Sequence, residues 1–400
     1  MLAAIRIILH NPAIRVATIA LFSTGLTYGA TLPYLSIVAI KEFGMSNVML
    51  SLLLFVIALA NLVYGVSIAL VSDAIRNVKP MILFVNLAGI IGFGLVYLLP
   101  HMAVFVFAAV LLVPLSNASF ALLFSSIRAF SSPLGNREAS AVTQVVRALY
   151  SGSWILVPGL IALWLANSNS LLPAWGFSAV ACLASFTIVW LLMPSLERSQ
   201  DAPRSPFFAS LRELTAANMI GLVVSMSLIT AAPRLLSVIQ PLIMTGLAGG
   251  KITDVGFVAG FTAGLEIPFM LMWGMCLQRL TVLQVLGIGT VIYAVFLALI
   301  SQASTPIEIY LLTIPNACGV SAILSLPLSY YHELSPERPG FGTSLNQITS
   351  FVSTGMSALA FSIGAATLGY SGSNWIGVVM VILGIAGLFA LDHRSKGKRP

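Results

Sequence analysis

Long apolar stretches alternate with short polar segments along the whole chain. Each stretch has about the twenty apolar residues that a helix needs to cross a bilayer core of about 30 Å. The pattern predicts twelve membrane-spanning helices over residues 16–38, 48–71, 80–99, 102–123, 140–164, 172–193, 218–245, 254–277, 281–301, 307–329, 343–366 and 374–391. The sequence therefore predicts an all-α integral membrane protein.

The longest polar connection between predicted spans divides the chain into two sets of six helices. It covers residues 194–217 and is rich in Ser, Pro and charged residues. We expect an N-terminal six-helix half at 1–193, a cytoplasmic loop at 194–217, and a C-terminal half with a short basic tail at 218–400. Two six-helix halves around a central binding site are typical of the major facilitator fold.

Basic residues predict which way the chain crosses the membrane. With a cytoplasmic N-terminus, fifteen of the 19 Lys and Arg residues lie in cytoplasmic segments, whereas only Lys41 and Lys251 lie outside and Arg147 and Arg234 lie within spans. Lys and Arg accumulate on the cytoplasmic side of membrane proteins. Both termini are therefore expected in the cytoplasm.

Composition excludes most other classes of protein. Hydrophobic residues make up 58% of the chain and charged residues 8%, about a third of the share in soluble domains. The net charge of +7 comes from loops and the tail, which favours membrane lipids as partners over nucleic acid. The four histidines lie in loops or at span ends and the three cysteines in apolar runs, so no metal site, disulfide or cofactor is expected. The sequence also has no phosphate-binding loop, which excludes an ATP-driven pump.

Three charges lie deep within predicted spans, where a charge costs about 2.5–3.5 kcal/mol. Glu266 lies about 12 Å and Arg147 about 10 Å from the cytoplasmic boundary, at 1.5 Å per residue. We therefore predict that Glu266 and Arg147 approach each other as the proton-coupling residues. A static ion pair that joins the two halves is one alternative, and a hydrogen bond from Glu266 to a sugar is another. Arg234 lies nearer the outer boundary, where a long side chain can reach the interface.

Uncharged polar side chains in the spans are candidates for binding a neutral polyol, because amides both donate and accept hydrogen bonds. Helix–helix hydrogen bonds and aromatic belts at the interface are the alternative roles. The candidate substrate-binding residues are Tyr28, Asn117, Gln144, Trp154, Asn316, Asn346 and Gln347. Asp73 and Arg76, in the loop after the second span, are candidates for a gating loop, and a solvated loop is the alternative.

Three segments resemble the sugar efflux transporter family of the major facilitator superfamily. Residues 255–274, with the string AGLEIP, resemble the family's eighth helix, and residues 143–162 its fifth helix. Residues 330–355 are similar to the connection between its tenth and eleventh helices. The resemblance implies proton-coupled export of neutral sugars or glycosides across a bacterial inner membrane, with Glu266 and Arg147 as functional residues.

A secondary transporter is therefore the expected function, with a sugar and protons as partners and a functional monomer as the working unit. Proton-coupled export of amphiphilic drugs is the alternative, favoured by the apolar spans and the single deep acid. A membrane enzyme would need a cluster of acids or a histidine near the spans, and a sensor would need a large cytoplasmic surface. Neither feature is present in the sequence.

Overall fold

The structure is a computed structural model, and it describes residues 2–75, 77–168, 170–195, 217–334 and 339–396. Within these residues the chain is nearly all helical. Eleven helices are long and apolar enough to cross a membrane, and the number rises to twelve if a bent pair, Ala4–His10 and Pro12–Glu42, forms one span. The all-α membrane fold is thus confirmed. Most of the predicted loop at 194–217 and the end of the basic tail lie outside the described residues.

The chain forms two compact units. Unit 1 contains residues 1–38 and 59–205, and unit 2 contains residues 39–58 and 206–400. Helix α4, Asn47–Ala74, begins in unit 2 and ends in unit 1. The units thus differ from the predicted halves in the short segment 39–58, which packs with the C-terminal helices.

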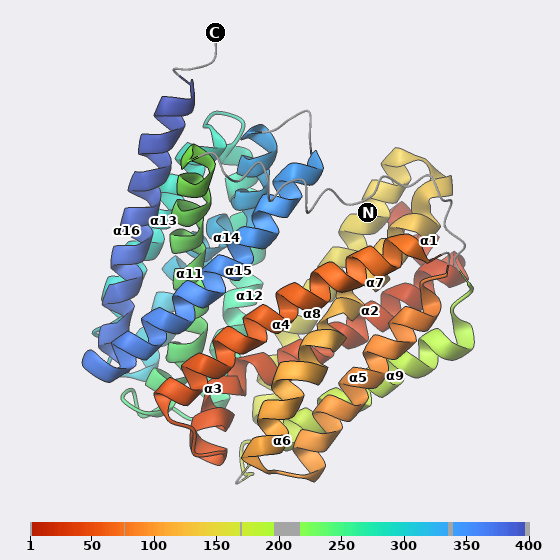
Figure 1. Cartoon of the computed structure of the whole chain (residues 1–400), viewed down its shortest axis with the longest axis horizontal. Coiled ribbons are helices and arrows are strands. Elements are labelled where there is room, and N and C mark those ends of the chain that lie inside the picture. The colour runs from red at the N-terminus through yellow and green to blue at the C-terminus, as the bar shows by residue number, and fades with distance from the viewer. Residues whose placement is uncertain (1, 76, 169, 196–216, 335–338, 397–400) are drawn as a thin grey trace. The chain divides into compact units, whose positions relative to one another are not determined.

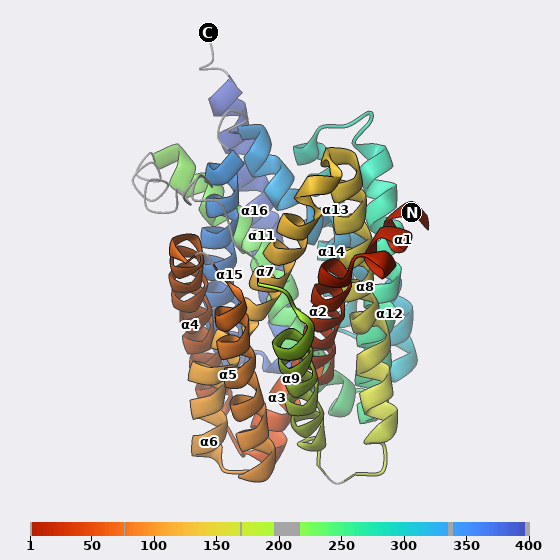
Figure 2. The ribbon, with the colours of Figure 1, turned by 90° about the vertical axis from the view of Figure 1, so that its right-hand side faces the viewer.

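Unit 1 is built around α2. This helix packs against α7, α8 and α9, and α5 packs against α7 and α9. Figure 1 and Figure 2 show α5 and α9 side by side, and Figure 2 shows the bend between α1 and α2. The segments Ala4–His10 and Pro12–Glu42 meet at an angle of 101°. The helices of this unit, besides the end of α4, are α1 Leu2–His10, α2 Pro12–Thr31, α5 Lys79–Leu98, α6 Met102–Phe107, α7 Val113–Ser131, α8 Asn136–Trp164 and α9 Pro173–Leu192.

Unit 2 is built around α11 and α14. Helix α11 packs against α15 and α16, while α14 packs against α12, α13 and α15. Figure 1 shows α11, α15 and α16 side by side. The helices of this unit, besides the start of α4, are α11 Ala217–Thr245, α12 Ile252–Cys276, α13 Val282–Ile300, α14 Pro306–Leu334, α15 Pro339–Thr367 and α16 Gly369–Lys396.

Two proline-containing segments depart from regular α-helix. After α2, the chain passes through a 3-10 turn at Leu32–Tyr34, a short α3 at Leu35–Ile37 and a π turn at Val38–Glu42. Between α6 and α7 lies a π segment at Ala108–Leu112, directly before Pro114. Proline lacks the N–H that would continue the α-helical bonding, and the backbone adjusts locally. The fourth span runs from Met102 to Leu134 and is longer than the predicted span 102–123.

Polar residues at helix ends satisfy the backbone groups left without partners there. Asn11 accepts hydrogen bonds from the N–H groups of Ala13 and Ile14 at the start of α2. Thr281 and Gln284 exchange bonds at the start of α13, as in a capping box. Such caps fix where each helix begins.

Side chains that contact lipid and side chains between helices differ in size. Large apolar residues such as Leu52, Leu271 and Leu311 are 63%, 68% and 65% exposed, as expected of surfaces in contact with lipid. Between α11 and α16 the contact is made at Gly384, where an added Cβ would lie 2.7 Å from the Ser225 carbonyl oxygen. Small residues allow membrane helices to approach closely, because packing rather than the hydrophobic effect holds them together.

This contact predicts opposite effects of one substitution at two glycines. Gly384→Ala should lower the free energy of unfolding by about 1–3 kcal/mol, because the new methyl group overlaps the backbone of α11. Gly274→Ala in α12, where nothing lies within 4 Å, should raise it by up to about 1 kcal/mol through helix propensity. Unfolding in mixed micelles measures both. Equal effects at the two positions would contradict the packing described.

Candidate functional site

Three polar side chains from three helices form a hydrogen-bonded chain in unit 1. The Tyr28 hydroxyl of α2 donates to Asn117 Oδ1 of α7 over 2.7 Å. Asn117 Nδ2 then donates to Asn61 Oδ1 of α4, also over 2.7 Å. All three residues are partly exposed. The structure thus brings together two of the predicted binding residues and adds Asn61.

Aromatic side chains of α8 and α7 lie beside these three hydrogen-bonded side chains. The hydroxyl groups of Tyr28 and Tyr150 are close enough to interact electrostatically. The Tyr150 hydroxyl also interacts with the side chain of Trp154, one turn further along α8. The Tyr150 ring packs against Phe120 of α7 with 4.8 Å between ring centroids. Hydrogen-bonding groups and aromatic rings are therefore combined in one region of unit 1.

Arg147 lies on the same face of α8 as these aromatic residues. Residues three and seven apart share a helix face, which aligns Arg147 with Tyr150 and Trp154. The side chains of Arg147 and Gln144 are both exposed. Arg147 belongs to unit 1 and Glu266 to unit 2, so their approach stays a prediction.

Glu266 lies inside α12, ten residues before its last residue, Cys276. Its side chain is partly exposed. Pro268 follows two residues later and cannot donate to the Gly264 carbonyl, which weakens the helix there. Glu266 acts electrostatically on the hydroxyl group of Tyr293 in α13.

The remaining predicted binding residues lie on two helices of unit 2. Asn316 of α14 is buried, with 4% of its surface exposed. On α15, Asn346 is partly exposed and Gln347 is exposed, one turn before Ser350. Ser350 accepts a 2.7 Å hydrogen bond from Arg234 of α11.

Arg234 does not extend to the outer interface as the sequence suggested. It lies eleven residues, or about 16 Å, before the end of α11 at Thr245, and its guanidinium group is held by α15. A long side chain reaches the interface only near a helix end, whereas Arg234 lies near the middle of its helix.

The predicted gating loop is only partly visible. Asp73 lies at the end of α4, but its side chain and the whole of Arg76 lie outside the described residues. Their role stays a prediction.

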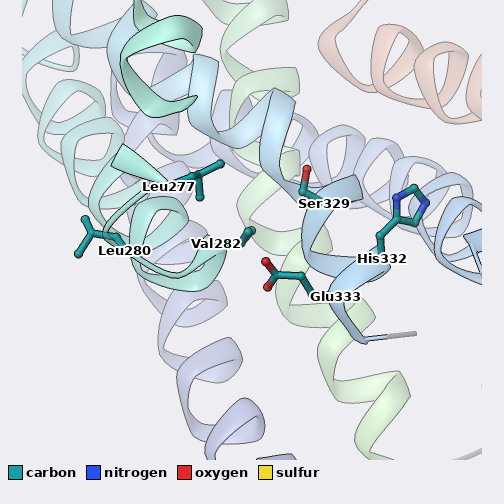
Figure 3. A pocket seen from close by; sticks show the side chains of 6 residues that line it. All are labelled: Leu277, Leu280, Val282, Ser329, His332 and Glu333. Carbon is teal, nitrogen blue, oxygen red and sulfur yellow. The ribbon is translucent and has the colours of Figure 1, made fainter. Parts of the chain in front are cut away.

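An open pocket of about 530 Å³ lies at the end of unit 2 where α12 turns into α13. Figure 3 shows its lining from that turn, Leu277, Leu280 and Val282, and from α14, Ser329, His332 and Glu333. Leu277 is eleven residues along the chain from Glu266, or about 16 Å at the helical rise. The pocket is therefore separate from the deep charge. Among the described residues no three His, Cys, Asp or Glu side chains are grouped as a metal site would need.

The sequence analysis gave neither Asn61 nor Arg234 a place in the site, and it missed Tyr293. An amide or a charge in an apolar stretch is a usable signal, and it was present for the first two. Tyr293 gives no such signal, because aromatic residues are common in membrane helices.

No family model matches the chain. The chain is 27% identical over 369 residues to "Sugar efflux transporter C" of Escherichia coli (strain K12), covering 91% of this chain and 92% of that protein. It is 24% identical over 364 residues to "Sugar efflux transporter B" of Salmonella typhimurium (strain LT2), covering 91% and 92%. The relatives are transporters rather than enzymes, as the sequence led us to expect.

Solved structures of other transporters share the fold. The crystal structure of the nucleoside transporter NupG matches with a TM-score of 0.79 at 12% identity, over 97% of this chain and 100% of that one. A peptide transporter POT in complex with sulfate matches with a TM-score of 0.75 at 13% identity, over 96% and 95%. These structures confirm the major facilitator fold.

The hydrogen bond between Tyr28 and Asn117 predicts that their substitutions are not additive. Tyr28→Phe and Asn117→Leu together should lower the free energy of unfolding less than the sum of the single changes, by about 0.6 kcal/mol. A double-mutant cycle measured in mixed micelles checks this coupling. Tyr97→Phe, an exposed tyrosine of α5, is the matched control and should be additive with Asn117→Leu. Additivity in both cycles would mean that the bond contributes nothing.

Proposed function

The chain is a membrane transporter with the major facilitator fold and a homologue of the sugar efflux transporters, and on this premise we propose that it exports neutral sugars or glycosides by proton-coupled alternating access. The names of its relatives supply the class of solute. The candidate site has to supply the groups that bind a sugar and the group that carries a proton.

The observation that carries this proposal is the chain Tyr28–Asn117–Asn61. All three side chains are uncharged, and Tyr28 and Asn117 have hydrogen-bonding capacity beyond the two bonds described, because a tyrosine oxygen also accepts and an amide nitrogen donates twice. A sugar hydroxyl both donates and accepts, and so it complements this chain. The rings of Tyr150 and Trp154 offer apolar faces for the C–H groups of a sugar. Binding of a lipophilic cation would instead be favoured by a negatively charged side chain, and these five residues include none.

Glu266 is the proposed proton carrier. It is the acidic side chain placed deepest in the spans, and carboxylates in that position usually serve function because a buried charge is costly. It is also partly exposed, so water can deliver a proton. Arg147 is its proposed partner from the other unit, where it would favour the charged form of Glu266.

The remaining assignments follow from the same proposal. Gln144, Asn316, Asn346 and Gln347 are proposed to contribute further hydrogen bonds to the sugar. Asp73 and Arg76 are proposed to form a gate. The protein is proposed to lie in a bacterial inner membrane with both termini in the cytoplasm and to work as a monomer, because twelve helices suffice for one transport pathway.

The proton-coupling proposal predicts that Glu266→Gln abolishes gradient-driven transport. Everted membrane vesicles with an imposed pH gradient should accumulate a labelled sugar, and in Glu266→Gln accumulation should fall to the level seen without a gradient. Glutamine keeps the shape of the side chain but cannot take up a proton at this pH. Glu333→Gln, an exposed glutamate at the end of α14, is the control and should behave as wild type. Undiminished accumulation by Glu266→Gln would remove Glu266 from the coupling step.

The sugar-binding proposal is separated from drug export by a substitution in the hydrogen-bonded chain. Asn117→Leu should lower sugar transport about tenfold at low sugar concentration, because the loss of one or two hydrogen bonds costs about 1.4 kcal/mol. Transport of a hydrophobic dye should change little. Asn86→Leu is the control, since Asn86 Nδ2 donates to the Ile82 carbonyl within α5 and Asn86 Oδ1 accepts from the Ser119 hydroxyl of α7. Dye transport that depends on Glu266, with no sugar transport by wild type, would favour the drug exporter instead.

A further inference from the structure

Tyr293 is a fully buried tyrosine whose hydroxyl group has no hydrogen-bond partner among the described residues. None of its side-chain surface is exposed. A buried hydroxyl without a partner costs about 1–3 kcal/mol, and such groups are rare in folded proteins. The Thr290 hydroxyl, one turn earlier on the same face of α13, is also buried and without a described partner. Two unsatisfied hydroxyl groups on one face indicate that a polar partner is needed there in some state of the protein.

The position of Tyr293 is fixed by its backbone contacts. Gly319 of α14 lies so close that an added Cβ would be 2.7 Å from Tyr293 Cβ and 2.9 Å from its backbone nitrogen. The ring packs against Phe296 of its own helix with 5.4 Å between centroids. The hydroxyl group is therefore held in a defined place, and its missing partner does not result from a loose side chain.

Glu266 is at the same depth as Tyr293. Helices α12 and α13 are joined by a short turn, residues 277–281, from which both extend back into the span with opposite chain direction. Ten residues separate Glu266 from Cys276 and eleven separate Tyr293 from Val282, which gives about 15 and 16 Å at the helical rise. The electrostatic effect of Glu266 on the Tyr293 hydroxyl agrees with this common level. Glu266 in turn makes no hydrogen bond to the described residues of its own unit.

Four other titratable side chains on the helices around α12 and α13 form hydrogen bonds elsewhere. These are Arg234 of α11 at Ser350, Tyr310 of α14 at Asp254, Tyr331 of α14 at Thr349, and Tyr330 of α14 at Asp392 of α16. The Cys318 carbonyl of α14 accepts from Trp273 of α12. Among the described groups, Tyr293 is thus the phenol that is free to donate a hydrogen bond to Glu266.

We propose that the Tyr293 hydroxyl group donates a hydrogen bond to the Glu266 carboxylate when Glu266 has released its proton, and is without a partner when Glu266 is protonated. In the release step the O–H bond of the carboxyl group breaks and the proton passes to water. The electron pair stays on the carboxylate, which then accepts a hydrogen bond from Tyr293. Tyr293 keeps its own proton throughout. The proposal rests on the proposed function, because it assigns Glu266 a proton that comes and goes.

Such a bond would link proton release to a structural change. A hydrogen bond to a charged acceptor is about twice as strong as one between neutral groups, so the bond stabilises the ionised state. It forms only if Glu266 and Tyr293 move together, and the unpartnered hydroxyl shows that they are apart in this conformation. Tyr293 therefore acts as a positioning residue for Glu266.

The test compares Tyr293→Phe, which removes one oxygen atom and keeps the packed ring, with Tyr310→Phe. The control removes a tyrosine hydroxyl that bonds Asp254 at the far end of α12. Infrared difference spectra between high and low pH on the purified full chain should show carboxyl bands that Glu266→Gln abolishes. Those bands should shift in Tyr293→Phe and stay in place in Tyr310→Phe. Unshifted Glu266 bands in Tyr293→Phe would overturn the proposal.

A transport measurement separates positioning from simple structural damage. In Tyr293→Phe, pH-gradient-driven accumulation of the sugar should fall about tenfold, since a charge-assisted hydrogen bond is lost. Exchange of labelled for unlabelled sugar without a gradient should continue at the wild-type rate. Equal losses in both modes would also overturn the proposal. If wild type moves no sugar, the proposed function fails, yet the infrared bands still decide whether Tyr293 bonds Glu266.

Discussion

The hydrocarbon core of the membrane offers no hydrogen bonds, and this constraint determines where polar side chains occur in the protein. Most serines and threonines in the spans satisfy it within their own helix by donating to a carbonyl one turn earlier, as Thr18 does to Ile14 and Thr313 to Ile309. Polar groups whose bonds connect different helices are less common and depend on the tertiary structure. The Tyr28–Asn117–Asn61 chain and the Arg234–Ser350 bond belong to this second class. A side chain that forms such bonds while partly exposed is available to a solute as well as to the fold.

The two units carry different kinds of polar chemistry. Unit 1 has a cluster of uncharged amides and aromatic rings around Tyr28, with Arg147 on the same face of α8. Unit 2 has Glu266 and Arg234 within its helices, and the described residues give neither an ion-pair partner in that unit. If the proposed function holds, recognition of a neutral solute falls mainly to unit 1 and proton transfer to unit 2. Such a division lets the solute and the proton bind to separate groups.

The sequence predicted the helices well because one quantity, the length of an apolar stretch, determines them. It also identified Tyr28, Asn117 and Glu266 as unusual, since polar groups in apolar stretches are visible residue by residue. It did not predict which of them meet. Tyr28 and Asn117 are 89 positions apart, and nothing in their local sequence distinguishes Asn117, which lies in a cluster, from Asn86, which joins α5 to α7. Tyr293 could not be identified at all, because its significance lies in a missing hydrogen bond and in its contact with Gly319.

The bonds around Glu266 limit how α12 can move. At one end of α12, Asp254 accepts a hydrogen bond from Tyr310 of α14. At the other end, Trp273 donates to the Cys318 carbonyl and the Ser321 hydroxyl, which also belong to α14. Helix α13 is held against α14 at Gly319. A rigid shift of α12 would break both end contacts, whereas a bend between them would break neither. Between the two end contacts, α12 contains Pro268 and α14 contains Pro315. Each proline removes one backbone hydrogen bond from its helix. Under the proposal, a bend at Pro268, two residues from Glu266, is the movement of α12 that would bring the carboxyl group to Tyr293 with both end contacts kept.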